Sequence, residues 1–152
     1  MSRVAVITGG AGGLGQAFAA RLLKDDWRVV LIDLSGALDA LPAAFAQTGS
    51  GSVERFACDL TDEAAVGSVC AEISARHPAL DLVIHNAGVT QIGLFDETTL
   101  ASQRLVMEIN YFGSVRMAAG LLAAVRAGRG THLAISSVAG FAPLYKRTAY
   151  AA

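Results

Sequence analysis

The stretch VAVITGGAGGLG, residues 4–15, decides the fold of this chain. A short apolar run leads into five glycines within seven residues, and a helical pattern follows. Glycines let the backbone approach a phosphate closely, and the start of a helix offers free N–H groups to an anion. This order predicts a strand, a glycine-rich turn and a helix that together bind a nucleotide.

The register of this turn stays open when the turn is considered alone. Gly10, Gly12 and Gly15 fit the pattern G-x-G-x-x-G, whereas G-x-x-G-x-x-G begins at Gly9 and T-G-x-x-x-G-x-G begins at Thr8. Residues elsewhere in the chain must therefore select the register.

Length, charge and hydropathy narrow the class of protein. The chain has 152 residues, the size of one ordinary domain. Its formal net charge of −1, from 12 basic and 13 acidic residues, indicates neither a nucleic-acid nor an anionic-membrane partner. Hydrophobic residues make up 53% and the mean hydropathy is +0.47, yet no apolar run approaches the ~20 residues of a membrane-spanning helix. Parallel strands buried on both faces explain this composition.

Neither the N-terminus nor the cysteine pattern points away from the cytoplasm. The apolar run at residues 4–7 is too short for a signal peptide and ends in the glycine turn. Cys58 and Cys70 have no metal-site or redox-motif spacing, and two cysteines do not make a disulfide framework. We therefore expect a cytoplasmic protein without a metal site.

Strand-like and helical patterns alternate along the chain. Strands are predicted over residues 3–8, 28–33, 53–58, 82–85 and 132–136, and helices over residues 14–26, 36–47, 62–76 and 100–127. Thr61 is the expected cap of the third helix, and Gly128-Arg129-Gly130 is the expected stop of the last. This alternation predicts an α/β fold, a doubly wound, Rossmann-like parallel sheet between two helix layers. We expect one domain over residues 1–152 that lacks the C-terminal strands of a complete sheet.

Ligands of such a sheet bind beyond the carboxyl ends of its strands, so the residues that close each strand are site candidates. Asp33 closes the second predicted strand, where a carboxylate suits the hydroxyls of an adenosine ribose and would repel a 2′-phosphate. No Arg or Lys stands among residues 9–15, and Leu34 follows Asp33. The pattern therefore favours NAD over NADP, with a solvated aspartate or a helix cap as the alternative for Asp33.

The third and fourth strands also end in polar or small residues. Asp59 is placed to approach an adenine, or else Asp59, Thr61 and Asp62 only cap the next helix. Asn86-Ala87-Gly88 follows the fourth strand, where the small pair lets a ligand lie close to the backbone. The amide of Asn86 is suited to brace this loop.

The three histidines form no metal or acid–base pattern. His85 closes the fourth predicted strand, and a single histidine without a partner is more often packed in the core than catalytic. His77 and His132 have no partner in the pattern either, so His85 is expected to be structural.

Together these pieces resemble the short-chain dehydrogenase/reductase family, in its compact branch. The matching positions, whose order and spacing extend over the whole chain, are Thr8, Gly9, Gly13, Gly15, Asp59, Asn86, Ala87, Gly88, Asn110, Ser136, Ser137, Gly140 and Tyr150. The resemblance selects the register of the turn that begins at Thr8. The implied cofactor-binding residues are Thr8, Gly9, Gly12, Gly13, Leu14, Gly15, Asp33, Asp59, Leu60, Asn86, Ala87 and Gly88.

The resemblance also implies the chemistry, a hydride transfer between nicotinamide and the carbon of an alcohol or ketone substrate. It assigns Tyr150 as general acid/base, Ser137 as the hydroxyl that orients and polarises the substrate oxygen, and Asn110 as the holder of a water in a proton relay. An unperturbed phenol has a pKa of ~10, so work near pH 7 requires a nearby positive charge that favours the phenolate.

Two positions depart from the family pattern. His85 stands where the family often has asparagine. The motif Tyr-x-x-x-Lys calls for a lysine at position 154, beyond Ala152, and Lys146 precedes Tyr150 and cannot take this role. We expect an N-terminal portion of a dehydrogenase whose complete form is a homo-oligomer. The alternative is a short dinucleotide-binding protein that acts as a sensor or assembly partner without catalysis.

Overall fold

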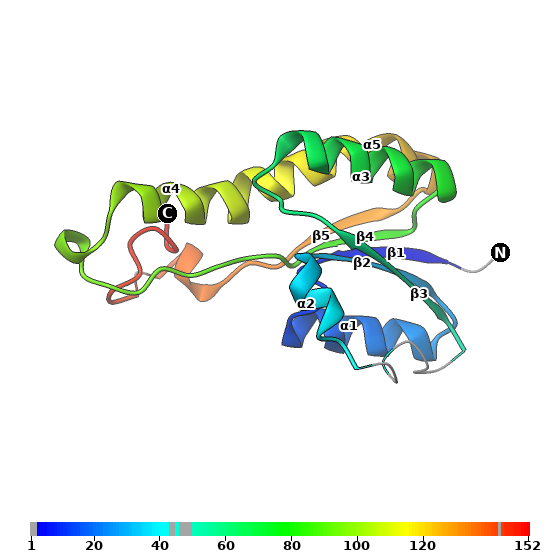
Figure 1. The fold of residues 1–152 in the computed structure, drawn as a ribbon, viewed down its shortest axis with the longest axis horizontal. Helices are drawn as coiled ribbons and strands as arrows, with labels where there is room; N and C mark the ends of the chain where they lie inside the picture. Colours follow the sequence, from blue (N-terminus) through cyan, green and yellow to red (C-terminus); the bar gives the residue numbers. More distant parts are fainter. Residues whose placement is uncertain (1–2, 43–44, 46–49, 143) are drawn as a thin grey trace.

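One parallel sheet organises the protein. The computed structural model describes residues 3–42, 45, 50–142 and 144–152. The strands are β1 (Val4–Thr8), β2 (Arg28–Asp33), β3 (Ser52–Ala57), β4 (Leu82–His85) and β5 (Thr131–Ala134). Their spatial order is β3-β2-β1-β4-β5, so the chain reverses direction across the sheet between β3 and β4 (Figure 1). This is the predicted doubly wound fold, and its reversal point lies between β1 and β4.

Helices cover both faces of the sheet. The helices α1 (Gly13–Lys24) and α2 (Ser35–Asp39) lie on one face, and α3 (Glu63–Arg76) and α5 (Ser114–Gly128) lie on the other (Figure 1). Successive residues of β1 serve the two sides, since Val6 belongs to the core with α3 and α5 and Ile7 to the core with α1. Every residue of β1 is buried, and β2 and β4 are buried over most of their length, as predicted from the high hydropathy, whereas the edge strands β3 and β5 are mostly exposed or half-buried.

The strand register brings the predicted site residues to one edge. Thr8 pairs with Ile32, and Ile7 pairs with Ile84, so β1, β2 and β4 end at nearly the same level. The glycine turn, Asp33 and the loop after His85 therefore emerge side by side.

Several predicted boundaries were wrong by a few residues. The helix predicted over residues 36–47 is α2, which ends at Asp39, and residues 43–44 and 46–47 lie outside the described part. The N-cap of α3 is Asp62, whose Oδ1 accepts a hydrogen bond from the Ala65 N–H at 3.0 Å. Thr61, the predicted cap, instead donates its hydroxyl to Asp59. The last strand ends at Ala134 rather than at residue 136, so the two serines lie in the loop that follows.

The long helix predicted over residues 100–127 is interrupted. It consists of α4 (Leu100–Met107), the π-helical segment η3 (Glu108–Gly113) and α5. Figure 1 shows α4 extending past the sheet, whereas α5 covers it. The helix stops as expected, since Arg129 takes the left-handed conformation (φ 52°) directly after Gly128. Within the described residues, no helix has both the length and the hydropathy to cross a membrane.

Candidate cofactor site and active site

The glycine turn is packed too closely for side chains at three of its positions, Gly9, Gly10 and Gly15. Gly9 has a left-handed φ of 64°, and a Cβ there would lie 2.8 Å from the Cα of Ala87. A Cβ on Gly15 would collide with the carbonyl oxygen of Gly9. These contacts explain why the turn requires glycine at positions 9 and 15, which belong both to the register that begins at Thr8 and to the one that begins at Gly9.

The start of α1 is open to an anion. Gly12 is the N-cap and provides no side-chain hydrogen bond, and the first turn of the helix contains no acidic residue. A Cβ built on Gly13 would meet nothing within 4 Å. Free N–H groups, the positive end of the helix dipole and unfilled space meet here, so the turn fits the phosphates of a dinucleotide.

Thr8 and Asn86 fasten the glycine turn to the loop after β4. The Thr8 Oγ1 accepts hydrogen bonds from the N–H groups of Asn86 and Ala87, each at 3.1 Å. In return, the Asn86 Nδ2 donates to the carbonyl oxygens of Thr8 at 3.1 Å and Gly9 at 3.0 Å. The prediction that Asn86 braces its loop is confirmed. Thr8 is 1% exposed, so a buried side chain stabilises the backbone of the site.

Two aspartates at strand ends hold their neighbouring loops. The Asp33 Oδ2 accepts a hydrogen bond from the Ala11 N–H at 3.0 Å, and its Oδ1 accepts one from the Leu34 N–H at 2.8 Å. The Asp59 Oδ1 accepts from the backbone N–H of Thr61 at 2.9 Å and from its hydroxyl at 2.8 Å. These two bonds lower the pKa of the Asp59 carboxyl below its ordinary value.

A cavity of about 450 Å³ gathers most of the predicted cofactor residues. Those that line it are Gly9, Gly12, Gly13, Leu14, Asp33, Asp59, Leu60, Asn86, Ala87 and Gly88. Thr8 and Gly15, the other two, shape the turn without lining this cavity. The other residues that line it, which were not predicted to bind the cofactor, are Ile32, Leu34, Cys58, Thr61, Val89, Leu105 and Ile109. Cys58 carries a usable signal in the sequence, because it directly precedes Asp59 at the end of the third predicted strand.

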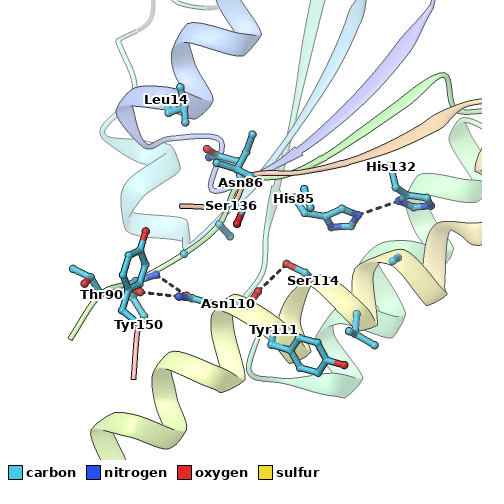
Figure 2. A pocket seen from close by; sticks show the side chains of 17 residues that line it. Leu14, His85, Asn86, Thr90, Asn110, Tyr111, Ser114, His132, Ser136 and Tyr150 are labelled. Atoms are coloured by element: carbon cyan, nitrogen blue, oxygen red, sulfur yellow. Dashed lines mark hydrogen bonds between the residues drawn. The ribbon is translucent and has the colours of Figure 1, made fainter. Parts of the chain in front are cut away.

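A second cavity, of about 630 Å³, adjoins the first and contains two of the three predicted catalytic residues. Asn110, Ser136 and Tyr150 line it, and Asn86 to Val89 line both cavities (Figure 2). Ser137 is not among its lining residues. The Ser137 Oγ instead accepts a hydrogen bond from the Ala139 N–H at 3.2 Å, and the role assigned to Ser137 stays a prediction.

Asn110 ties the interrupted helix to the loop after β4. Its Oδ1 accepts a hydrogen bond from the Val89 N–H at 2.8 Å, and its Nδ2 donates to the Val89 carbonyl oxygen at 2.9 Å (Figure 2). Its backbone carbonyl oxygen accepts from the Ser114 hydroxyl at 3.2 Å. Asn110 lies in η3, so the wide π turn carries the side chain that makes both hydrogen bonds to the Val89 backbone at the cavity wall.

The structure corrects the interpretation of the histidines. The Nε2 of His85 lies 3.0 Å from the Nδ1 of His132, and the two rings face the second cavity (Figure 2). The ring planes differ by 18° and the centroids are 5.2 Å apart, about the longest separation that this bond allows, so the rings lie end to end. His77 also has a partner, since its Nε2 lies 2.7 Å from the Glu54 Oε1. The sequence pattern missed these pairs because each joins residues on different strands or elements.

Burial sets the protonation state of the histidine pair. His85 is 6% exposed, as expected of a core residue. Burial, with a further contribution from His132, lowers the pKa of His85 to about 4. The pair is therefore uncharged at neutral pH.

A family model described as short chain dehydrogenase matches residues 3–152. Among curated proteins, the chain is 35% identical over 156 residues to "Dehydrogenase/reductase SDR family member 7B" of Rattus norvegicus, covering 98% of this chain and 48% of that protein. The chain thus spans about half the length of the curated relatives it matches.

The chain is also similar to solved structures of a short-chain oxidoreductase and an alcohol dehydrogenase. A metagenomic short-chain oxidoreductase in complex with NADP is 30% identical, with a TM-score of 0.89, and the match covers 98% of this chain and 68% of that one. An alcohol dehydrogenase from the archaeon Thermococcus sibiricus, complexed with 5-hydroxy-NADP, reaches a TM-score of 0.92 at 23% identity, over 99% of this chain and 65% of that one. The second match shows a shared fold.

Proposed function

The chain belongs to the short-chain dehydrogenase family, and from this premise we propose that the complete protein is an NAD(P)(H)-dependent oxidoreductase. Its reaction is the transfer of a hydride between nicotinamide and the carbon of a small alcohol or ketone. One observation carries the proposal: the cavity lined by the glycine turn and the strand ends adjoins a second cavity lined by Asn110, Ser136 and Tyr150. A dinucleotide in the first cavity would therefore have a reaction site beside it.

The residues of the first cavity suit the parts of a dinucleotide. The uncapped start of α1 offers backbone N–H groups to the pyrophosphate, and Asp33 offers a carboxylate to the ribose hydroxyls. The Ala87-Gly88 pair leaves room for close approach to the backbone. When bound, the nicotinamide would accept or supply the hydride.

Tyr150 is the proposed general acid/base. Its phenol would take the proton from a substrate alcohol or give one to a ketone. The Ser137 hydroxyl, which the family motif assigns by its distance in sequence from Tyr150, would orient the substrate oxygen. A phenolate near pH 7 requires a positive charge beside it, because an ordinary tyrosine titrates at ~10. The Lys146 ammonium lies 5.6 Å from the ring centroid of Tyr145. The family motif assigns this role to position 154.

The preference between the two cofactors forms the finer part of the proposal. Asp33 lines the cavity, its carboxylate accepts a bond from the glycine turn, and no basic side chain stands among residues 9–15. A 2′-phosphate beside this carboxylate would meet repulsion without a compensating cation. We therefore propose NAD(H) as the cofactor, although two structural relatives hold NADP-type molecules.

Titration of the complete protein with NADH and with NADPH, followed by nicotinamide fluorescence, tests this preference. We expect the wild-type protein to bind NADH roughly 10-fold more tightly than NADPH. Asp33→Asn should bring the two dissociation constants closer together, because the substitution removes the negative charge and keeps the shape of the side chain. Asp96→Asn, at an exposed site outside both cavities, is the matched control and should leave the ratio unchanged. Tighter binding of NADPH by the wild-type protein would rule out the preference.

Two further expectations belong to this proposal. A reducing, cytoplasmic location suits the two cysteines, both free and buried. A homo-oligomer is expected for the complete protein from its family. The non-catalytic alternative is not favoured, because the matching relatives are named as dehydrogenases and reductases.

A further inference from the structure

Two segments distant in sequence are fastened together at the rim of the second cavity. The Gly93 N–H donates to the Lys146 carbonyl oxygen at 3.1 Å, and the Ala149 N–H donates to the Gln91 Oε1 at 3.3 Å. A third bond joins side chains, with the Arg147 Nη1 donating to the Thr90 Oγ1 at 2.6 Å. Residues 90–93 and 146–149 therefore lie side by side.

A buried amide fixes this arrangement. Gln91 is only 7% exposed, and its Nε2 donates to the Gly93 carbonyl oxygen at 3.2 Å while its Oε1 accepts the bond from Ala149. Both ends of the amide are thus used inside the protein. The backbone that carries Arg147 is consequently held in place rather than free in solvent.

Arg147 and Tyr150 belong to one turn of the backbone, three positions apart. The Ala151 N–H donates to the Arg147 carbonyl oxygen at 2.9 Å, the bond of an α-helical turn. Side chains three residues apart on such a turn point to the same side. Thr90, whose hydroxyl accepts the bond from Arg147, lines the same cavity as Tyr150 (Figure 2).

Among the described residues, the positive charge of the Arg147 guanidinium has no ion-pair partner. No Asp, Glu, Lys or Arg side chain lines the second cavity, and Arg147 itself is hydrogen-bonded to this lining only through Thr90. Among the described residues, the ion pairs of the other arginines join Arg21 to Asp25, Arg76 to Glu54 and Glu72, and Arg116 to Glu108, and none involves Arg147. The guanidinium has five N–H donors, and within the described part of the chain its only side-chain partner is the neutral hydroxyl of Thr90.

We propose that Arg147 determines substrate specificity by binding an anionic group, of which a carboxylate is the simplest, on the substrate that Tyr150 protonates or deprotonates. The preferred substrates are then oxo acids or hydroxy acids rather than neutral ketones or alcohols. A guanidinium binds a carboxylate through two parallel hydrogen bonds, and an uncharged cavity wall screens this interaction less than water does. This inference rests on the proposed oxidoreductase function.

The test compares acids with their own neutral esters. The complete protein, loaded with its nicotinamide cofactor, is assayed with 2-, 3- and 4-oxo carboxylic acids and with the methyl ester of each. We expect one chain length among the acids to exceed its ester in kcat/KM. Arg147→Met should lower kcat/KM for that acid by about 10- to 100-fold, mainly through KM, and leave the ester within about 3-fold.

Two further variants separate substrate recognition from loop structure. Arg147→Lys keeps the charge without the planar fork and should recover part of the lost acid activity. Arg126→Met removes the same charge from an exposed position in the last turn of α5 and should leave kcat/KM unchanged for both the acid and its ester. The acid preference of the wild-type protein should also weaken as ionic strength rises.

Three results would overturn the inference. Equal losses for acid and ester in Arg147→Met would show a structural role for Arg147. A wild-type protein that turns over neutral ketones without preferring any acid would exclude it, as would one that binds NADH but shows neither turnover of an acid nor a change in NADH fluorescence on adding one. Failure to bind any nicotinamide cofactor would instead contradict the proposed function itself.

Discussion

His85 and His132 share one hydrogen bond, and the remaining nitrogen of each ring, Nδ1 of His85 and Nε2 of His132, has no partner among the described residues. When both rings are neutral, one donates in the shared bond and the other accepts. Of the two outer nitrogens, one is then a donor and the other an acceptor. A proton added to either ring would be buried against the cavity wall without a counter-ion, which is why burial lowers the pKa of His85.

This shift makes stability depend on pH. The pKa of His85 lies at about 4 in the folded protein and near 6.5 in the unfolded chain. Between these values only the unfolded chain takes up the proton, so the free energy of unfolding falls as the pH is lowered from 6.5 to 4. The loss from His85 should reach about 3 kcal/mol.

Urea unfolding at several pH values checks this expectation. His85→Asn, which keeps a polar side chain, should flatten the dependence between pH 6.5 and 4. Part of the pH dependence that remains in the variant should come from His132, because burial lowers the pKa of His132 as well. Parallel curves for the wild-type protein and the variant would show that His85 is not the group that titrates.

Among the elements, α3 and the interrupted helix show how local sequence and tertiary contacts divide the control of structure. The start of α3 is capped by the Asp62 side chain, one residue later than Thr61. Both residue types cap helices well, so sequence alone does not choose between them. The choice follows from the Asp59 carboxylate, which binds both the N–H and the hydroxyl of Thr61 and leaves Asp62 as the cap.

The two candidate caps are expected to differ in their contribution to stability. Asp62→Ala should lower the free energy of unfolding by about 1 kcal/mol, because the Ala65 N–H loses its acceptor. Thr61→Ala should cost only a few tenths of a kcal/mol, since it removes one exposed hydroxyl bond. Chemical denaturation of both variants measures the difference, and a larger effect at Thr61 would contradict the assignment of the cap.

For the molecule as a whole, the reversal of the sheet between β1 and β4 places two cavities side by side. The first cavity collects backbone N–H groups and carboxylates, which suits a dinucleotide. The second has an almost entirely neutral wall that contains Tyr150, Asn110 and the histidine pair. No cationic side chain lines it, so none of its lining residues supplies the positive charge that a phenolate needs.

The 152-residue chain by itself should therefore bind nicotinamide cofactor but show negligible turnover. Lowering the pKa of a phenol from ~10 to 7 requires about 4 kcal/mol of favourable interaction, which the family motif Tyr-x-x-x-Lys assigns in part to a lysine four residues after the tyrosine. Cofactor fluorescence first establishes that the chain is folded and loaded, and nicotinamide absorbance then measures turnover. Measurable dehydrogenase activity would show that Tyr150 works without this lysine.

The sequence by itself determined what depends on neighbours along the chain. Residues 4–15 predicted a buried strand, a glycine turn and a helix because the apolar run and glycine spacing act locally. The residues at strand ends then indicated the cofactor site, because parallel strands place their carboxyl ends at one edge. Asp33, Asn86 and Gly88 were found in this way, and all three line one cavity.

Only the tertiary structure decided what depends on residues far apart in sequence. The bond between His85 and His132 spans 47 positions and that between Thr90 and Arg147 spans 57, and neither leaves a periodic signal in the sequence. The exposure of Ser136 to the second cavity and the capping bond of Ser137 follow from where β5 ends, which pairing with β4 determines. Local pattern thus places a backbone at the site, whereas packing between distant segments decides which side chains meet there and in which charge state.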